Sequence, residues 1–115
     1  MVAGLSEIGE VLRLLGVGGN CSGHRITAEA VLLVSKEPDR LLNVTKQVYQ
    51  VVGQRCGCSW QGVERAIRSA AKRAWLRNSR YLIELARYPL EGPPTSSEFI
   101  DILSSYFLRN SSKMG

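Results

Sequence analysis

A dense group of basic side chains in the second half of the chain could bind a polyanion. The segment from Gln61 to Tyr88 holds seven basic and two acidic residues, which accounts for the whole formal net charge of +5. The basic residues are Arg65, Arg68, Lys72, Arg73, Arg77, Arg80 and Arg87. Because neutralised phosphates supply most non-specific affinity for nucleic acids, this local excess favours a nucleic-acid partner. A solvated, arginine-rich helix face explains the charge alone equally well.

The helix expected over residues 59–76 separates an apolar stripe from a polar face. The stripe, at spacings of three and four, contains Val63, Ala66, Ile67, Ala70, Ala71, Ala74 and Trp75. The other side carries Gln61, Glu64, Arg65, Arg68, Lys72 and Arg73. In a DNA-recognition helix the N-terminal residues reach base edges in the major groove, and later basic residues contact phosphates.

Two neighbouring residues on this face have the chemistry to read bases. The guanidinium group of Arg65 suits a bidentate contact with O6 and N7 of guanine, and Glu64 can accept a hydrogen bond from N4 of cytosine. An acidic residue within a basic face weakens purely non-specific binding, so Glu64 favours base reading. The alternative is a surface Arg–Glu pair that contributes little energy.

Residues 49–68 meet the geometric requirements of a helix-turn-helix. That motif joins two helices, crossing at about 90–120°, through a short turn that often contains glycine. Gly53 supplies a small residue for the crossing, and Gly57 tolerates a positive φ in the turn. The apolar positions around the turn are Val52, Cys56, Cys58, Val63 and Ala66. Both cysteines are therefore interpreted as small core residues.

Helical periodicity dominates the rest of the chain and predicts an all-α fold, a compact bundle of about six helices that contains the helix-turn-helix. Further helices are expected over residues 6–15, 28–37, 44–55 and 80–86, and after residue 95, with residues 21–26 in a loop. Asn43 and Ser59 are expected to cap the helices that follow them, and Thr95 and Glu98 to form a capping box. The length of 115 residues predicts a single domain over residues 1–115, with an ordered core at about residues 5–108.

The composition argues against a membrane protein, a metal site and an enzyme. No apolar run approaches the roughly 20 residues of a membrane span, and residues 1–6 do not resemble a signal peptide, so a cytoplasmic, nucleoid-associated location is expected. Three cysteines, two of them spaced as Cys56 and Cys58, fit neither a disulfide framework nor the usual zinc spacing. His24 is the one histidine, and no nucleophile has an evident general base. No metal, cofactor or catalytic residue is expected.

Several stretches of the chain are similar to one known family. The two long ones are Val63-Glu64-Arg65-Ala66-Ile67-Arg68, followed by Ala74-Trp75, and Pro94-Thr95-Ser96-Ser97-Glu98-Phe99-Ile100. Shorter ones are Leu15-Gly16-Val17, Glu29-Ala30 and Val44-Thr45-Lys46-Gln47-Val48-Tyr49. They resemble the C-terminal DNA-binding effector domain of the sporulation initiation master response regulator family, and the resemblance extends over about residues 5–108.

The resemblance implies a six-helix transcription-factor domain that binds short double-stranded DNA boxes with a CG step, often as tandem head-to-tail pairs. Glu64 and Arg65 fall on the family's base-reading positions and Arg68 on a DNA-facing position, so these three are the expected base-reading residues. The candidates for phosphate contacts are Ser59, Trp60, Gln61, Lys72, Arg73 and Lys46. The other expected partners are a second copy of the domain, as a homodimer or a tandem pair, and RNA polymerase.

Departures from the family's pattern leave a second function open. Trp60 and Gly62 stand where the family usually has a small residue and a polar or basic one, and the family's N-terminal receiver domain is not in this chain. The alternative is a receiver-less paralogue that modulates a full-length regulator by protein–protein interaction. Its candidate surface residues are Tyr81, Tyr106 and Phe107, although their helical spacing favours core packing. The presence of Glu64, Arg65 and Arg68 favours DNA binding, because a pure interaction module would not need them.

Overall fold

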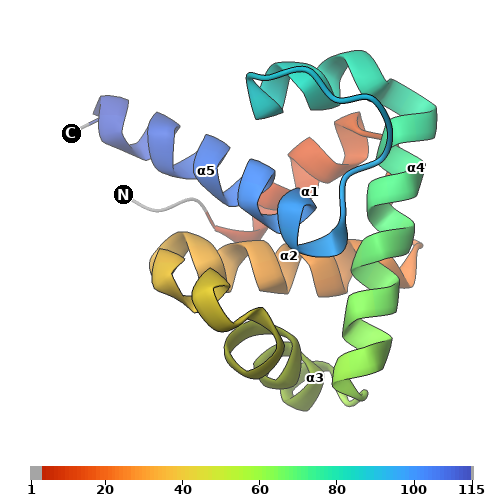
Figure 1. Cartoon of the computed structure of the whole chain (residues 1–115), viewed down its shortest axis with the longest axis vertical. Helices are drawn as coiled ribbons and strands as arrows, with labels where there is room; N and C mark the ends of the chain where they lie inside the picture. The colour runs from red at the N-terminus through yellow and green to blue at the C-terminus, as the bar shows by residue number, and fades with distance from the viewer. Residues whose placement is uncertain (1–3, 115) are drawn as a thin grey trace.

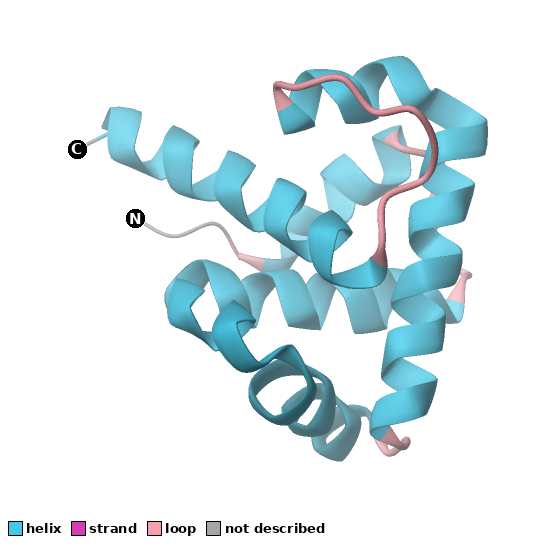
Figure 2. Cartoon of the chain, viewed as in Figure 1, coloured by secondary structure: helices cyan, strands magenta, loops and turns pink. Residues whose placement is uncertain are grey.

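The computed structural model describes residues 4–114 of the chain and the side chains of residues 4–110 (Figures 1 and 2). Its elements are α1 (Leu5–Leu14), α2 (Ser22–Lys36), the 3-10 helix η1 (Pro38–Asn43), the π-helix η2 (Thr45–Tyr49), α3 (Gln50–Cys56), α4 (Trp60–Ala86) and α5 (Ser96–Met114). Between residues 4 and 114 there is no strand, so the predicted all-α bundle is confirmed. None of the helices in this part of the chain is long and apolar enough to cross a membrane.

The core lies where α1, α2, α4 and α5 meet. Helix α5 packs on both α2 and α4, and α2 also packs on α1. The largest fully buried side chains are Ile8, Leu12, Leu15, Val17, Val31, Val34, Val48, Ile67, Leu82, Phe99, Ile100 and Leu103. Phe107 is buried too, and the half-buried Tyr106 meets it edge-on, with ring centroids 5.1 Å apart. The aromatic residues of α5 therefore belong to the core, as their helical spacing predicts.

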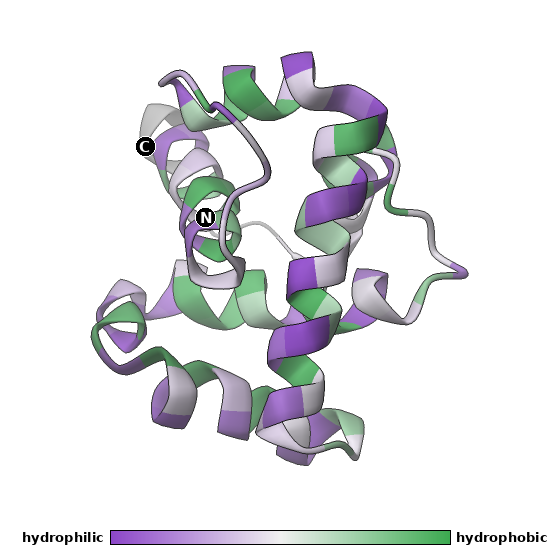
Figure 3. Cartoon of the chain, turned by 45° about the vertical axis from the view of Figure 1, so that its right-hand side comes forward, coloured by the Kyte–Doolittle hydropathy of each residue, from purple (hydrophilic) through white to green (hydrophobic). Residues whose placement is uncertain are grey.

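Helix α4 is the longest element and has a kink at Asn78. Figure 3 shows polar and apolar residues alternating along its ribbon. Asn78 has non-helical backbone angles, φ −158° and ψ 62°. Its side chain accepts a hydrogen bond from the N–H of Tyr81 (3.3 Å) and donates one to the carbonyl of Leu14 (2.9 Å). Asn78 thus caps a second helical segment within α4, in agreement with the separate helices predicted over 59–76 and 80–86.

The predicted loop at residues 21–26 is wrong, because α2 already begins at Ser22. The reason is tertiary packing. A Cβ atom built on Gly23 would lie 2.9 Å from the carbonyl oxygen of Ala66, so the backbones of α2 and α4 touch there. His24 Nδ1 lies 3.1 Å from the carbonyl oxygen of Val17, which ties the same turn to the loop before it. These contacts stabilise a helical turn that the local composition does not favour.

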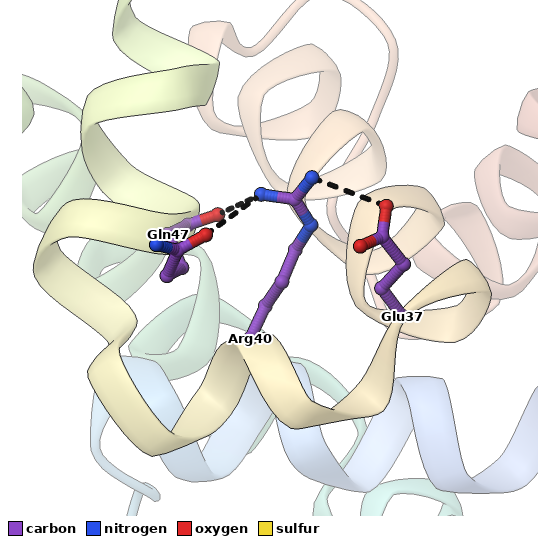
Figure 4. A network of polar contacts seen from close by, with 3 residues as sticks. All are labelled: Glu37, Arg40 and Gln47. Carbon is purple, nitrogen blue, oxygen red and sulfur yellow. Dashed lines mark hydrogen bonds and ion pairs between the residues drawn. The ribbon is translucent and has the colours of Figure 1, made fainter.

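Asn43 does not cap the next helix, contrary to the sequence-based expectation. It is the last residue of η1, and the N-cap position of η2 is Val44, where no side chain caps the helix by a hydrogen bond. The two short helices are joined instead by Arg40 (Figure 4). Its guanidinium donates to the backbone carbonyl of Gln47 (2.9 Å), to the Gln47 side chain (3.3 Å) and to Glu37 (3.1 Å).

The capping box predicted at the start of α5 is half formed. The Thr95 hydroxyl accepts a hydrogen bond from the N–H of Glu98 (3.2 Å), as predicted. The Glu98 carboxylate, however, accepts a hydrogen bond from the hydroxyl of Tyr88 (3.0 Å). Tyr88 thereby connects the loop before α5 to the first turn of that helix. Burial, and then the hydrogen bond to Glu98, raise the pKa of Tyr88 to about 12.

Candidate nucleic-acid interface

The turn between α3 and α4 has the close backbone packing that a helix-turn-helix requires. A Cβ atom on Gly53 would lie 2.5 Å from the carbonyl oxygen of Cys58. The N–H of Cys58 donates back to the carbonyl of Gly53 at 2.9 Å. Gly57 between them ends α3 in the left-handed conformation, with φ 73°. The roles predicted for both glycines are confirmed, because a larger residue at 53 has no room and most residues at 57 are strained.

The two cysteines of the turn are less buried than predicted. Cys56 is half-buried and Cys58 is exposed, so the interpretation of Cys58 as a core residue is wrong. At the crossing it is the peptide of Cys58, and not its side chain, that packs on Gly53. Burial raises the pKa of the Cys56 thiol, and the nearby Arg25 opposes this effect. Arg25 is an exposed cation beside the turn, and it was not among the residues expected to contact DNA.

Ser59 caps α4 as predicted. Its backbone is extended, and its hydroxyl accepts a hydrogen bond from the N–H of Gly62 at 3.1 Å. The cap fixes where the helix starts, and with it which residues face the core. Ala66 and Trp75 of the predicted apolar stripe are half-buried, and its other five residues are buried: Val63, Ile67, Ala70, Ala71 and Ala74.

Eight of the nine residues predicted to contact DNA are exposed. They are Ser59, Trp60, Gln61, Arg65, Arg68, Lys72 and Arg73 in or next to α4, and Lys46 on η2. Trp60 is 37% exposed. The first turns of α4 therefore present a basic surface directly after their cap. We call Ser59, Gln61, Arg65, Arg68, Lys72 and Arg73 the basic face.

Shallow hollows flank the basic face on both sides. Arg65 lines one of them together with Ser69 and with Cys21, Ser22 and Gly23 at the start of α2. Arg68 and Lys72 line the other, whose far wall is the end of the loop before α5, at residues 93–96. The basic face is thus bordered by α2 on one side and by the entry to α5 on the other.

Glu64 is the predicted site residue that the fold holds most firmly. Its side chain is 27% exposed, about half the 52% of Arg68. Its Oε2 atom accepts a hydrogen bond from the Ser96 hydroxyl at 3.0 Å, and its Oε1 atom lies 3.5 Å from a guanidinium nitrogen of Arg68. The Ser96 hydroxyl is also 2.9 Å from the buried hydroxyl of Tyr49. One carboxylate oxygen is therefore anchored inside the protein, while the other lies beside an exposed arginine.

Ser96 and Tyr49 were not expected to touch the site. Ser96 lies within the motif that predicts a helix start, and Tyr49 lies at the beginning of the helix-turn-helix. Ser96 lies 32 residues from Glu64, and Tyr49 lies 47 residues from Ser96, so no local spacing could reveal these hydrogen bonds.

The comparison with known families agrees with this geometry. Residues 8–107 match the family described as sporulation initiation factor Spo0A C terminal. The match begins within α1, ends within α5 and includes the helix-turn-helix and the whole basic face. This family is one of DNA-binding effector domains of sporulation response regulators, and not of enzymes. The chain therefore belongs to the Spo0A C-terminal family of DNA-binding domains.

Proposed function

We propose that this domain binds double-stranded DNA sequence-specifically, with the N-terminal part of α4 in the major groove, and that it regulates transcription through this contact. The observation that carries the proposal is the basic face, which follows directly on a capped helix start and a helix-turn-helix turn. In that motif the second helix enters the major groove with its first residues at the base edges.

Arg65 and Arg68 of the basic face, and Glu64 at its edge, have distinct roles in this proposal. Arg65 is exposed and reads guanine through O6 and N7. Glu64 accepts a hydrogen bond from N4 of cytosine through its outer oxygen. Arg68 lies one helical turn beyond Glu64 and reaches a neighbouring base. A guanine and a cytosine read by adjacent residues fit a CG step.

The surrounding polar residues position the domain on the sugar-phosphate backbone. The proposed contacts are Ser59, Trp60, Gln61, Lys72, Arg73 and Lys46, joined by Arg25 at the start of α2. Such contacts supply affinity without sequence information. We infer in addition that the domain binds as a homodimer or a tandem head-to-tail pair and acts on RNA polymerase at the nucleoid.

Binding to two labelled duplexes of equal length and composition tests the proposal. One carries a CG-containing box of the family type, and the other carries the same bases scrambled. At near-physiological salt we expect the box to bind at least about tenfold more tightly, since each wrong base pair costs about 1–3 kcal/mol. Affinity for both duplexes should fall as salt rises, because phosphate contacts release counterions. Equal, weak binding of the two duplexes would refute sequence-specific recognition.

A further inference from the structure

A chain of hydrogen bonds connects the recognition helix to two distant elements. Tyr49 of η2 and Ser96 of α5 join their hydroxyls at 2.9 Å, and Ser96 joins Glu64 of α4 at 3.0 Å. Ser96 and Tyr49 are buried, with 7% and 3% of their surface exposed, whereas Glu64 lies at the edge of the basic face. The chain thus runs from the interior to the proposed DNA-binding surface.

Each of the two hydroxyl groups has one proton to donate, and this determines the direction of both hydrogen bonds. An ionised carboxylate can only accept, so the one hydroxyl proton of Ser96 goes to Glu64. Tyr49 must then donate its own proton to the oxygen of Ser96. A tyrosine hydroxyl, with an ordinary pKa of about 10, is protonated at neutral pH, and burial raises the pKa of Tyr49 further. All three groups are therefore satisfied in one arrangement, which ends at Oε2 of Glu64.

This arrangement removes rotational freedom from Glu64 before any DNA is bound. A glutamate on an exposed helix face samples many rotamers, and ordering them on binding costs entropy. Here Ser96 holds Oε2 on the side of α5, so that Oε1 remains on the side of Arg68. The side chain is presented in one orientation, and the cost of ordering it is met during folding.

We propose that Ser96 is a positioning residue for base reading, which orients Glu64 so that its outer oxygen discriminates the base pair it faces. The proposal rests on the proposed function, because it takes Glu64 as a base reader. It adds that specificity depends on a residue at the start of α5, outside the helix-turn-helix. The competing role is a purely structural one, in which the Ser96–Glu64 contact holds α5 against α4 and has no effect on base preference.

The test compares Ser96→Ala with two matched variants. Ser97→Ala makes the same chemical change at the next residue, whose side chain has no hydrogen bond among those described, and Ser96→Thr keeps the hydroxyl. Each is titrated with the box duplex and with duplexes in which one base pair of the CG step is replaced. We expect Ser96→Ala to lower discrimination by about three- to tenfold, at the base pair for which Glu64→Ala lowers it. Ser97→Ala and Ser96→Thr should discriminate as the wild type does, with the same salt dependence throughout.

The double variant Glu64→Ala with Ser96→Ala separates positioning from a structural role. If Ser96 acts through Glu64, its loss has no further effect on discrimination once Glu64 is gone. An equal effect of Ser96→Ala in both backgrounds, or a lower melting temperature with unchanged base preference, would overturn the positioning role and leave the proposed function intact. A wild-type protein that prefers no duplex would overturn both.

Discussion

Arg65→Ala is expected to remove about 1–3 kcal/mol of the discrimination between a CG-containing box and a duplex in which the guanine is replaced. The side chain is exposed at the front of the basic face, and no other described residue pairs with it by a hydrogen bond or an ion pair. The fold should be unaffected because nothing in the core depends on this side chain. Titration of the two duplexes at one salt concentration measures the loss.

Arg80→Ala is the matched control for this experiment. It removes the same side chain from the same helix and lowers the net charge by the same amount, but Arg80 lies beyond the kink at Asn78. It should weaken binding to both duplexes to the same small extent and leave discrimination unchanged. If both variants lowered affinity equally for every duplex, Arg65 would contribute only charge, and its role in base reading would be wrong.

Gly53→Ala is expected to lower the free energy of unfolding by about 1–3 kcal/mol, the usual cost of overpacking. Its Cβ atom would lie 2.5 Å from the carbonyl oxygen of Cys58, and this neighbour is backbone that cannot rotate away. Relief of the clash has to move α3 away from α4, which also shifts the basic face. Urea-induced unfolding, followed by circular dichroism, measures the change in stability.

Two other glycines show that the effect is one of packing and not of glycine content. Gly92→Ala should change stability little, since a Cβ atom there has nothing within 4 Å. Gly57→Ala also meets no neighbour but places alanine at φ 73°, so it should cost about 1–2 kcal/mol through backbone strain alone. A Gly53→Ala protein as stable as Gly92→Ala would contradict the close crossing of α3 and α4.

The helix-turn-helix and the basic face could be predicted because their signals are local. Within seven residues, Gly53 predicts the helix crossing, Gly57 the left-handed turn and Ser59 the cap of α4. The 3.6-residue period of α4 then determines which side chains are buried and which form the basic face. The kink at Asn78 lies between the helices predicted over residues 59–76 and 80–86.

Two features that were not predicted, the first turn of α2 and the anchoring of Glu64, depend on contacts between distant segments. The first turn of α2 is helical because Gly23 lets its backbone approach Ala66, some 40 residues later. The anchoring of Glu64 depends on Ser96, which reaches it only because α5 packs across α4. Cys58 was interpreted as a core residue. Its peptide group packs against Gly53 at the helix crossing, but its side chain is exposed to solvent.

A thermodynamic cycle between Arg65 and a guanine of the box tests most directly whether α4 reads bases in the major groove. Wild-type protein and Arg65→Ala are each titrated with the box duplex and with one in which 7-deazaguanine, which pairs normally but lacks the N7 acceptor, replaces that guanine. Wild-type protein is expected to bind the modified duplex at least about tenfold more weakly, because a hydrogen bond to a charged group contributes about 1.5–3 kcal/mol. Arg65→Ala should bind both duplexes alike. An equal loss for both proteins, or no loss for the wild type, would contradict a contact between Arg65 and guanine N7.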